Sequence, residues 1–325
     1  MCRRRRAAGL LGGAVAVLVV TAPPAAADPA RPGNVRSEVL AVDPPSRVFT
    51  LSVEGGDAFL HLAVARGHEV LVVGYQGEPF LRVDSDGTVS ENLTSPSLYL
   101  SRDRYAGTRV PEAADPKADP RWQPAGRGGT VTWHDHRIHW MGAGDPPVAE
   151  TSWEVPLLVD GAGATARGRY VRLDPPSPWP WLAVAVVLTV AGLALVRRRQ
   201  PAAWLAAATV AVVLPVTAGA LRAPGGTSGA VTAAALAALA GATAAGSILA
   251  ARVPIAAASL GAGSGVALLL WALLRFDVLT HAVLVSGLPE WWDRGVTVLA
   301  AAAGVVLVVA SVRSLLAATT PAAAP

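Results

Sequence analysis

One short segment concentrates the side chains that could do chemistry. Residues 133–141 read Trp-His-Asp-His-Arg-Ile-His-Trp-Met and hold three of the six histidines in the chain. Imidazole is the commonest metal-binding side chain, and two imidazoles at positions i and i+2 of a β-strand project from the same face. We therefore expect a metal site whose first pair is His134 and His136. The candidate ligands are His134, His136, His139, Asp135 and Met141.

The ligand types indicate which metal such a site would take. Imidazole nitrogen and thioether sulfur favour copper or zinc over calcium and magnesium, which need a cage of oxygen atoms. On a regular strand His139 would face away from the first pair, so a three-histidine site needs a bulge or turn. A structural interpretation stays open beside the metal one, in which Asp135 pairs with Arg137 and orients an imidazole within a hydrogen-bonded network.

Recognisable catalytic motifs are absent from the sequence. The single cysteine, Cys2, precedes the apolar part of the N-terminal segment, so a processed chain would have no thiol. The sequence also contains no G-x-S-x-G elbow, no H-E-x-x-H helix and no glycine-rich phosphate loop. We therefore interpret the chain as a protein that is not an enzyme.

The elements that must position the histidine segment are β-strands. Between residues 35 and 85, short runs alternate apolar and polar side chains and are separated by Pro- and Gly-containing turns. Residues 150–159 and 166–173 predict a closing hairpin across Asp160 and Gly161. This pattern predicts an immunoglobulin-like sandwich over residues 28–174, with residues 110–129 as a long loop.

The second half of the chain reads as membrane. Its apolar runs lack acidic residues, so we expect a bundle of about five transmembrane helices over residues 181–316, after a Pro-rich linker at 175–180. The predicted spans are 181–196, 202–221, 230–251, 255–274 and 296–312, followed by a tail at 317–325. Gly261, Gly263 and Gly265 permit close helix packing. Residues 278–288, which include His281, are too short to span and are expected to lie along the membrane interface.

Residues 1–27 resemble a secretory signal. Arg3 to Arg6 form a basic start, an apolar stretch follows, and three alanines at 25–27 offer a cleavage site. Arginines at 197–199 directly follow the first predicted span and should hold that end in the cytoplasm. The chain is then expected in the cell membrane, with the β domain outside the cytoplasm and the C-terminus inside. Removal of the four signal arginines lowers the formal charge from +4 to about zero, and we expect no nucleic-acid partner.

The order of parts resembles a group of actinobacterial membrane proteins. These have a signal peptide, an exported β domain with a W-H-D-H-R-x-H-W-M segment, and a helical bundle, and the group carries no established activity. A looser similarity is to CopC- and CopD-type copper-handling proteins, which combine an exported β-sandwich with a membrane partner. That resemblance implies copper handling. The chain departs from it because its processed N-terminus would begin Asp28-Pro29 and lacks the histidine ligand of the CopC type.

The leading hypothesis from sequence is an envelope protein that binds copper or zinc through the histidine segment and buffers the ion or passes it on. The rival hypothesis is a non-catalytic interaction or assembly protein. In that case residues 110–129 and exposed tryptophans would contact an envelope or membrane partner. A permease component is a weaker third interpretation, because the predicted spans contain no ionisable residue.

Overall fold

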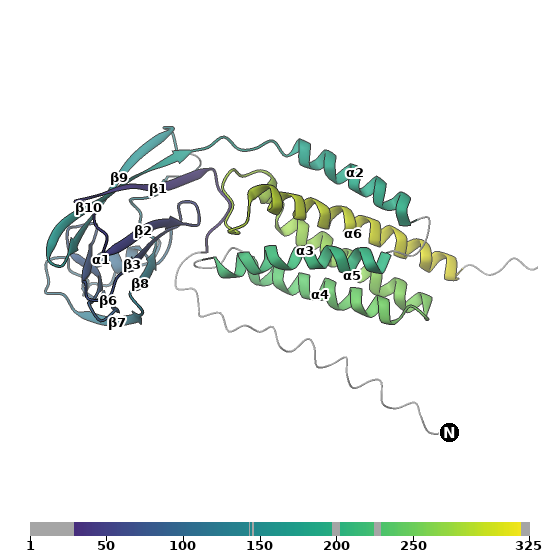
Figure 1. Cartoon of the computed structure of the whole chain (residues 1–325), viewed down its shortest axis with the longest axis horizontal. Coiled ribbons are helices and arrows are strands. Elements are labelled where there is room, and N and C mark those ends of the chain that lie inside the picture. The colour runs from purple at the N-terminus through teal and green to yellow at the C-terminus, as the bar shows by residue number, and fades with distance from the viewer. Residues whose placement is uncertain (1–28, 143, 145, 197–201, 224–228, 320–325) are drawn as a thin grey trace, which may run out of the picture.

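The chain forms a β domain and a helical bundle, with the β domain at one end of the bundle (Figure 1). A computed structural model describes residues 29–142, 144, 146–196, 202–223 and 229–319. The expected signal peptide at 1–27 and most of the expected tail lie outside these residues. Below, the end of the bundle nearest the β domain is called the β-domain end, and the opposite end the far end.

Two antiparallel sheets build the β domain. The larger sheet has the order β1-β10-β9-β4-β5-β6-β7 and the smaller has the order β2-β3-β8. Strands of the larger sheet are β1 (Val35–Asp43), β4 (Val70–Val73), β5 (Pro79–Val83), β6 (Thr88–Asn92), β7 (Trp122–Arg127), β9 (Glu150–Val159) and β10 (Ala162–Arg172). Strands of the smaller sheet are β2 (Phe49–Glu54), β3 (Phe59–Val64) and β8 (Thr130–Trp133). Immunoglobulin constant domains have sheets of four and three strands, so this arrangement agrees with a β-sheet domain without establishing that finer class.

Alternation along the strands places one face of each sheet in a shared core. In β9, Trp153, Val155 and Leu157 are buried and the residues between them are exposed. In β3, Leu60 and Leu62 are fully buried and join the same apolar cluster. The predicted closing hairpin is confirmed, because β9 and β10 pair across Asp160 and Gly161. Asp160 and Gly161 have positive φ angles of 50° and 80°, as a type I′ turn requires.

The expected loop at 110–129 is only partly a loop. Its second half forms β7, which pairs with β6 at the edge of the larger sheet. Pro124 and Gly126 hide the strand in the sequence, because neither fits a regular β pattern. An edge strand tolerates proline, since one side of its backbone has no partner to bond. A short helix, α1 (Pro96–Leu100), lies between β6 and this segment.

Five helices are long and apolar enough to cross a membrane, which fits an integral membrane protein. They are α2 (Trp179–Val196), α3 (Ala202–Arg222), α4 (Ala230–Leu249), α5 (Pro254–Leu274) and α6 (Glu290–Thr319). Helices α3 to α6 share one buried cluster, whereas α2 lies against α6 and has no fully buried residue. The last helix begins at Glu290 instead of 296, so it includes charged residues that the sequence placed in a loop.

Small residues set the closest helix contacts, as expected. A Cβ atom on Gly265 or Gly304 would lie 2.8 Å from the carbonyl oxygen of the other residue, so α5 and α6 meet backbone to backbone there. Gly261 faces Ser311 at a similar separation. By contrast, a Cβ on Gly263 would meet Thr243 at 3.5 Å, an ordinary contact. Two of the three glycines therefore mark places where a larger side chain would separate α5 from α6.

The β domain contacts the loop between α5 and α6. After a short 3₁₀ helix, η1 (Phe276–Leu279), the backbone of Val283 exchanges two hydrogen bonds with Gly33, at 3.1 and 2.8 Å. Asn34 Oδ1 accepts a hydrogen bond from the amide of Ala282 at 3.0 Å. Val283 and Val285 are buried. The β domain therefore covers these two valines, and the placement of 278–288 along a membrane interface stays a prediction.

Candidate functional site

The histidine segment leaves the sheet earlier than its sequence indicates. Strand β8 ends at Trp133, and residues 134–140 form a turn, so the prediction that His134 and His136 share a strand face is wrong. Asp135 causes the departure. Its carboxylate accepts the amide hydrogen of Arg137 at 3.1 Å, and its carbonyl accepts that of Ile138 at 3.1 Å. An aspartate that bonds the backbone two residues ahead replaces ladder bonds with a turn.

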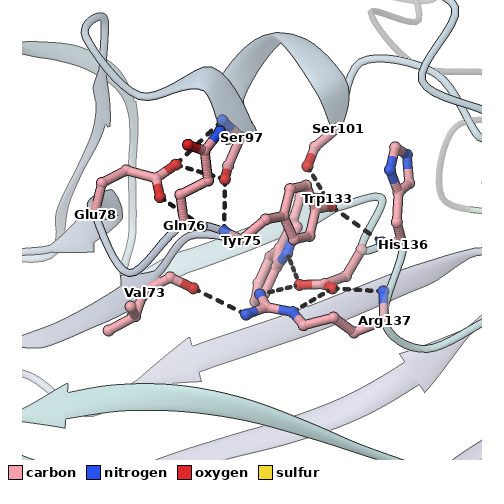
Figure 2. Close-up of polar contacts among 10 residues, drawn as sticks. Val73, Tyr75, Gln76, Glu78, Ser97, Ser101, Trp133, His136 and Arg137 are labelled. Carbon is pink, nitrogen blue, oxygen red and sulfur yellow. Dashed lines mark hydrogen bonds and ion pairs between the residues drawn. The ribbon is translucent and has the colours of Figure 1, made fainter. Parts of the chain in front are cut away.

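The carboxylate of Asp135 is committed to neighbouring side chains. It is fully buried and accepts hydrogen bonds from Trp133 Nε1 at 3.0 Å and from Arg137 Nε and Nη2 at 2.8 and 2.6 Å (Figure 2). Burial opposes the charge of Arg137, but the hydrogen bonds and charge of Asp135 raise the pKa of Arg137 above its usual value. Asp135 therefore serves as the centre of a buried ion pair and has little capacity left for a metal.

Tyr75 connects this ion pair to the rest of the domain. Its ring lies 5.1 Å from the guanidinium of Arg137, and its hydroxyl accepts the amide hydrogen of His136 at 3.0 Å and lies 2.8 Å from Ser101 Oγ. Burial and the charge of Asp135 raise the pKa of Tyr75, so the phenol stays neutral. Figure 2 shows the ring of His136 pointing away from the Arg137 guanidinium. Sequence reasoning missed Tyr75, since an isolated tyrosine in a strand-rich region carries no pattern.

Glu78 fixes the short helix next to Tyr75. Its buried carboxylate accepts hydrogen bonds from Ser95 Oγ, Ser97 Oγ and the amide of Gln76, at 2.7, 2.6 and 2.9 Å (Figure 2 draws the bonds to Ser97 and Gln76). Burial works against ionisation of Glu78, but these hydrogen bonds together lower its pKa. The carboxylate therefore stays charged and holds α1 against the turn between β4 and β5.

Each imidazole of the segment bonds a backbone carbonyl through one ring nitrogen. His134 Nδ1 lies 2.6 Å from the oxygen of Ala58, and His136 Nε2 lies 3.0 Å from that of Asp103. His139 Nε2 lies 2.9 Å from the oxygen of Arg104. A carbonyl oxygen only accepts, so the nitrogen facing it carries the proton. In neutral rings of His136 and His139, Nδ1 is then the unprotonated nitrogen.

His136 and His139 are the two imidazoles that lie together. Their ring centroids are 5.6 Å apart and their planes meet at 74°. His139 is 2% exposed, and its Nδ1 has no hydrogen-bond partner among the described residues. Burial and the nearby charge of Arg104 lower the pKa of His139 to about 3. The ring is therefore neutral at physiological pH, with an acceptor nitrogen that the surrounding residues leave unsatisfied.

The carbonyls of Asp103 and Arg104 are held by a compact loop. The carboxylate of Asp103 accepts hydrogen bonds from the amides of Tyr105, Gly107 and Thr108, at 3.0, 2.7 and 2.6 Å. It also accepts one from Thr108 Oγ1 at 2.6 Å. Burial opposes the charge, but these bonds lower the pKa of Asp103 to about 2. Arg104 in turn pairs with Asp57 at 2.6 Å, so the backbone that holds both histidines is itself restrained.

The structure does not bring all five candidate ligands together. Within the residues that it describes, no three or more His, Cys, Asp or Glu side chains are grouped closely enough to hold one metal ion. His134 stacks on Phe59 and Asp135 pairs with Arg137. Met141 lines a separate hollow of about 380 Å³, together with Asp57, Arg104 and Trp140. The arrangement is thus a pair of histidines beside a buried ion-pair network.

The other three histidines lie apart from this pair. His61 bonds Thr132 Oγ1 at 2.8 Å, and His68 pairs with Asp160 at 2.8 Å, both on partly exposed surface. His281 lies in the loop beneath the β domain, where its Nδ1 is 2.9 Å from the carbonyl oxygen of Asp277. All three therefore have polar partners of their own.

A second buried charge cluster occupies the β-domain end of the bundle. Arg275 pairs with Asp293 at 2.6 Å, and Asp293 is fully buried. Arg294 donates to the carbonyls of Val278 and His281 and to Glu290. The sequence predicted a loop along the membrane interface before the last helix, because the start of α6 cannot be recognised before its apolar run. The cluster joins α5, α6 and the loop between them.

No protein-family model, curated protein or solved structure matches this chain.

Proposed function

We propose that this integral membrane protein binds one transition-metal ion, copper(II) or zinc, through Nδ1 of His136 and Nδ1 of His139. One observation carries the proposal: the buried Nδ1 of His139 lacks a partner among the described residues, and the ring of His136 lies 5.6 Å away. Metal–nitrogen distances of about 2.0–2.1 Å place the ring centroids of two tetrahedral ligands about 5–6 Å apart. The observed separation of 5.6 Å agrees with this range.

The carbonyl contacts support this proposal. Histidines that bind metals usually donate their other ring N–H to a carbonyl or carboxylate, which fixes the tautomer and the orientation of the ring. His136 and His139 have that partner in the carbonyls of Asp103 and Arg104. The pair differs from the expected pair of His134 and His136, because the turn at Asp135 separates those two rings.

A site with two protein ligands would exchange its metal readily. Structural zinc sites are closed by four protein ligands, whereas a pair of histidines leaves positions for water or for a partner's side chain. Buffering or transfer of an ion fits such a site better than a permanent structural role. We place the site outside the cytoplasm because arginines are more frequent in the sequence at the opposite side of the helices. Arg197 to Arg199 directly follow α2, and Arg252 and Arg313 lie at the far end, as is typical of cytoplasmic helix ends.

Calorimetric titration of the purified full chain with Cu(II) and Zn(II) tests the proposal. We expect binding tighter than about 10 µM, near the −7 kcal/mol that corresponds to such an affinity. The His136→Ala/His139→Ala double variant should lose it, and the matched His61→Ala/His68→Ala variant should keep it. Unchanged binding in the first variant, or no binding by the wild type, refutes the site. Copper(II) EPR of the wild type gives an independent check, since it should report two coordinated nitrogens.

A second candidate function is assembly with another envelope or membrane protein. The observation that favours it is helix α2, which packs mainly against α6 among the described helices and leaves apolar side chains such as Val186, Val187 and Val190 more than 60% exposed. Cross-linking in native membranes separates the two functions. A defined partner that persists in the His136→Ala/His139→Ala variant, together with failed metal titrations, would favour assembly.

A further inference from the structure

The far end of the bundle contains an unfilled hollow of about 430 Å³. All five long helices contribute to its wall. Its lining is dominated by small side chains, including Ala206, Ala258 and Ala310, because larger residues at these positions would have filled the space. Among the residues that the structure describes, Arg313 is the one charged side chain in the lining, and none is acidic.

We propose that one acyl chain of an anionic phospholipid occupies this hollow, with the lipid phosphate beside Arg313. The five helices that form the wall are those able to cross a membrane, so in a bilayer the inner part of the hollow would lie at hydrocarbon depth and its outer part at the headgroups. Three serines line it as well, but the hydroxyls of Ser247 and Ser314 already donate to the carbonyls of Ala257 and Ala310. Water in bulk takes about 30 Å³ per molecule, and the alanine-rich part of the wall offers it few partners. A flexible hydrocarbon chain supplies the dispersion contacts that the small side chains leave unmade.

The positive charge of Arg313, at the rim of the hollow, favours a lipid with an anionic headgroup. Arg313 is exposed, and no described acidic residue forms an ion pair with it. Basic residues near a membrane surface attract anionic lipids with about 1 kcal/mol each, which is roughly a fivefold preference. Trp204, 69% exposed, also lines the hollow, and tryptophan is enriched at the level of lipid headgroups. A phospholipid satisfies the apolar wall and the cationic rim together.

This inference is independent of the metal proposal, because the two sites lie in different parts of the chain. Native mass spectrometry of the delipidated full chain, titrated with phosphatidylglycerol or phosphatidylcholine, tests it. We expect phosphatidylglycerol to be retained roughly fivefold more strongly. Arg313→Gln should lower that preference, and Arg222→Gln, at the opposite end of the bundle, should preserve it.

A second set of variants tests the proposal by filling the hollow with larger side chains. Ala258→Leu or Ala310→Leu should reduce retention of both lipids, whereas Val187→Leu on the exposed face of α2 should leave retention unchanged. Both filling variants are used, so that failure of one to fold leaves the other to decide; each is accepted only if it elutes as a single species. Equal retention of the two lipids by the wild type, or full retention in a folded filling variant, overturns the proposal.

Discussion

The imidazole of His134 stacks on the phenyl ring of Phe59, with 4.2 Å between centroids and 22° between planes. Phe59 also belongs to a small apolar cluster with Ala30, Ala58 and Val285, the last of which lies in the loop before α6. The first histidine of the segment is therefore packed against one of the residues through which the β domain contacts the loop before α6. His134, Phe59 and Val285 thus form a contact between the histidine segment and the loop before α6 that is separate from the linker at 175–178.

The contact between the β domain and the bundle predicts an efficient engineered disulfide. Gly33 and Val283 exchange two backbone hydrogen bonds, a pairing in which Cα atoms are about 5.5 Å apart. Disulfides span Cα separations of about 4.4–6.8 Å. We expect Gly33→Cys/Val283→Cys, in a Cys2→Ser background, to cross-link under mild oxidation. Cleavage at a protease site inserted into the linker at 175–178, followed by a non-reducing gel, would then show the two halves still joined. The pair Leu40→Cys/Val283→Cys is the control, and its two halves should separate after cleavage. Equal cross-linking of both pairs would contradict the contact between the β domain and the loop before α6.

Removal of Arg137 should destabilise the β domain strongly. The substitution Arg137→Ala leaves the carboxylate of Asp135 buried and without its counter-ion, and losing one partner of a buried pair costs about 3–5 kcal/mol. The pairs of Arg167 with Glu154 and Asp43 are exposed, so Arg167→Ala should change stability little. Thermal unfolding of both variants, followed by tryptophan fluorescence, measures the difference. Similar midpoints for the two variants would show that the Asp135–Arg137 pair does not organise the turn.

The low pKa of His139 predicts that acid weakens the metal-free fold. The pKa is about 3 in the folded protein against 6.5 for an unperturbed histidine, so between these values the unfolded chain binds more protons. Stability from this group is complete above pH 6.5 and is lost progressively as the pH falls toward 3. The unfolding midpoint, measured with a chelator present, should therefore decline over this window. His139→Gln should flatten the decline, while His61→Gln should not; the same slope in both would exclude His139 as its source.

Asp103 should act on metal affinity without touching the metal. Its carboxylate closes the loop whose carbonyls orient His136 and His139. Groups that hydrogen-bond to metal ligands and orient them typically contribute about 10–100-fold to metal affinity. We expect Asp103→Asn to weaken Cu(II) or Zn(II) binding by about tenfold, because an amide replaces one acceptor oxygen by a donor. Titration calorimetry measures the change, with Asp115→Asn in the neighbouring loop as the control. An unaltered metal affinity would show that the loop closed by Asp103 does not contribute to metal binding.

Close packing of α5 and α6 predicts a difference between two glycines. A Cβ on Gly304 would approach the carbonyl oxygen of Gly265 and the side chain of Leu269 at 2.8 and 2.7 Å, so Gly304→Ala must move a helix. Such overpacking costs about 1–3 kcal/mol. Gly263→Ala meets only ordinary contacts and should be neutral or slightly stabilising, since alanine favours helix over glycine. Thermal unfolding in detergent compares the two, and equal midpoints would contradict the packing.

Much of the architecture could be predicted because it depends on local pattern. Alternation with a period of two marks β3 and β9, and apolar runs without acidic residues mark the five long helices. Element ends were less predictable. Asp135 ended β8 early through its own backbone bond, and α6 began at a charged residue six positions before its apolar run.

The sequence by itself determined that a strand-rich half is followed by a membrane-compatible half, and that the imidazoles are concentrated in one segment. Only the tertiary structure decided which imidazoles meet, because their partners are distant along the chain. Ala58 precedes His134 by 76 positions, Asp103 precedes His136 by 33, and Arg104 precedes His139 by 35. Periodicity reports which face a residue occupies, whereas the orientation of a ring depends on backbone groups that folding brings beside it.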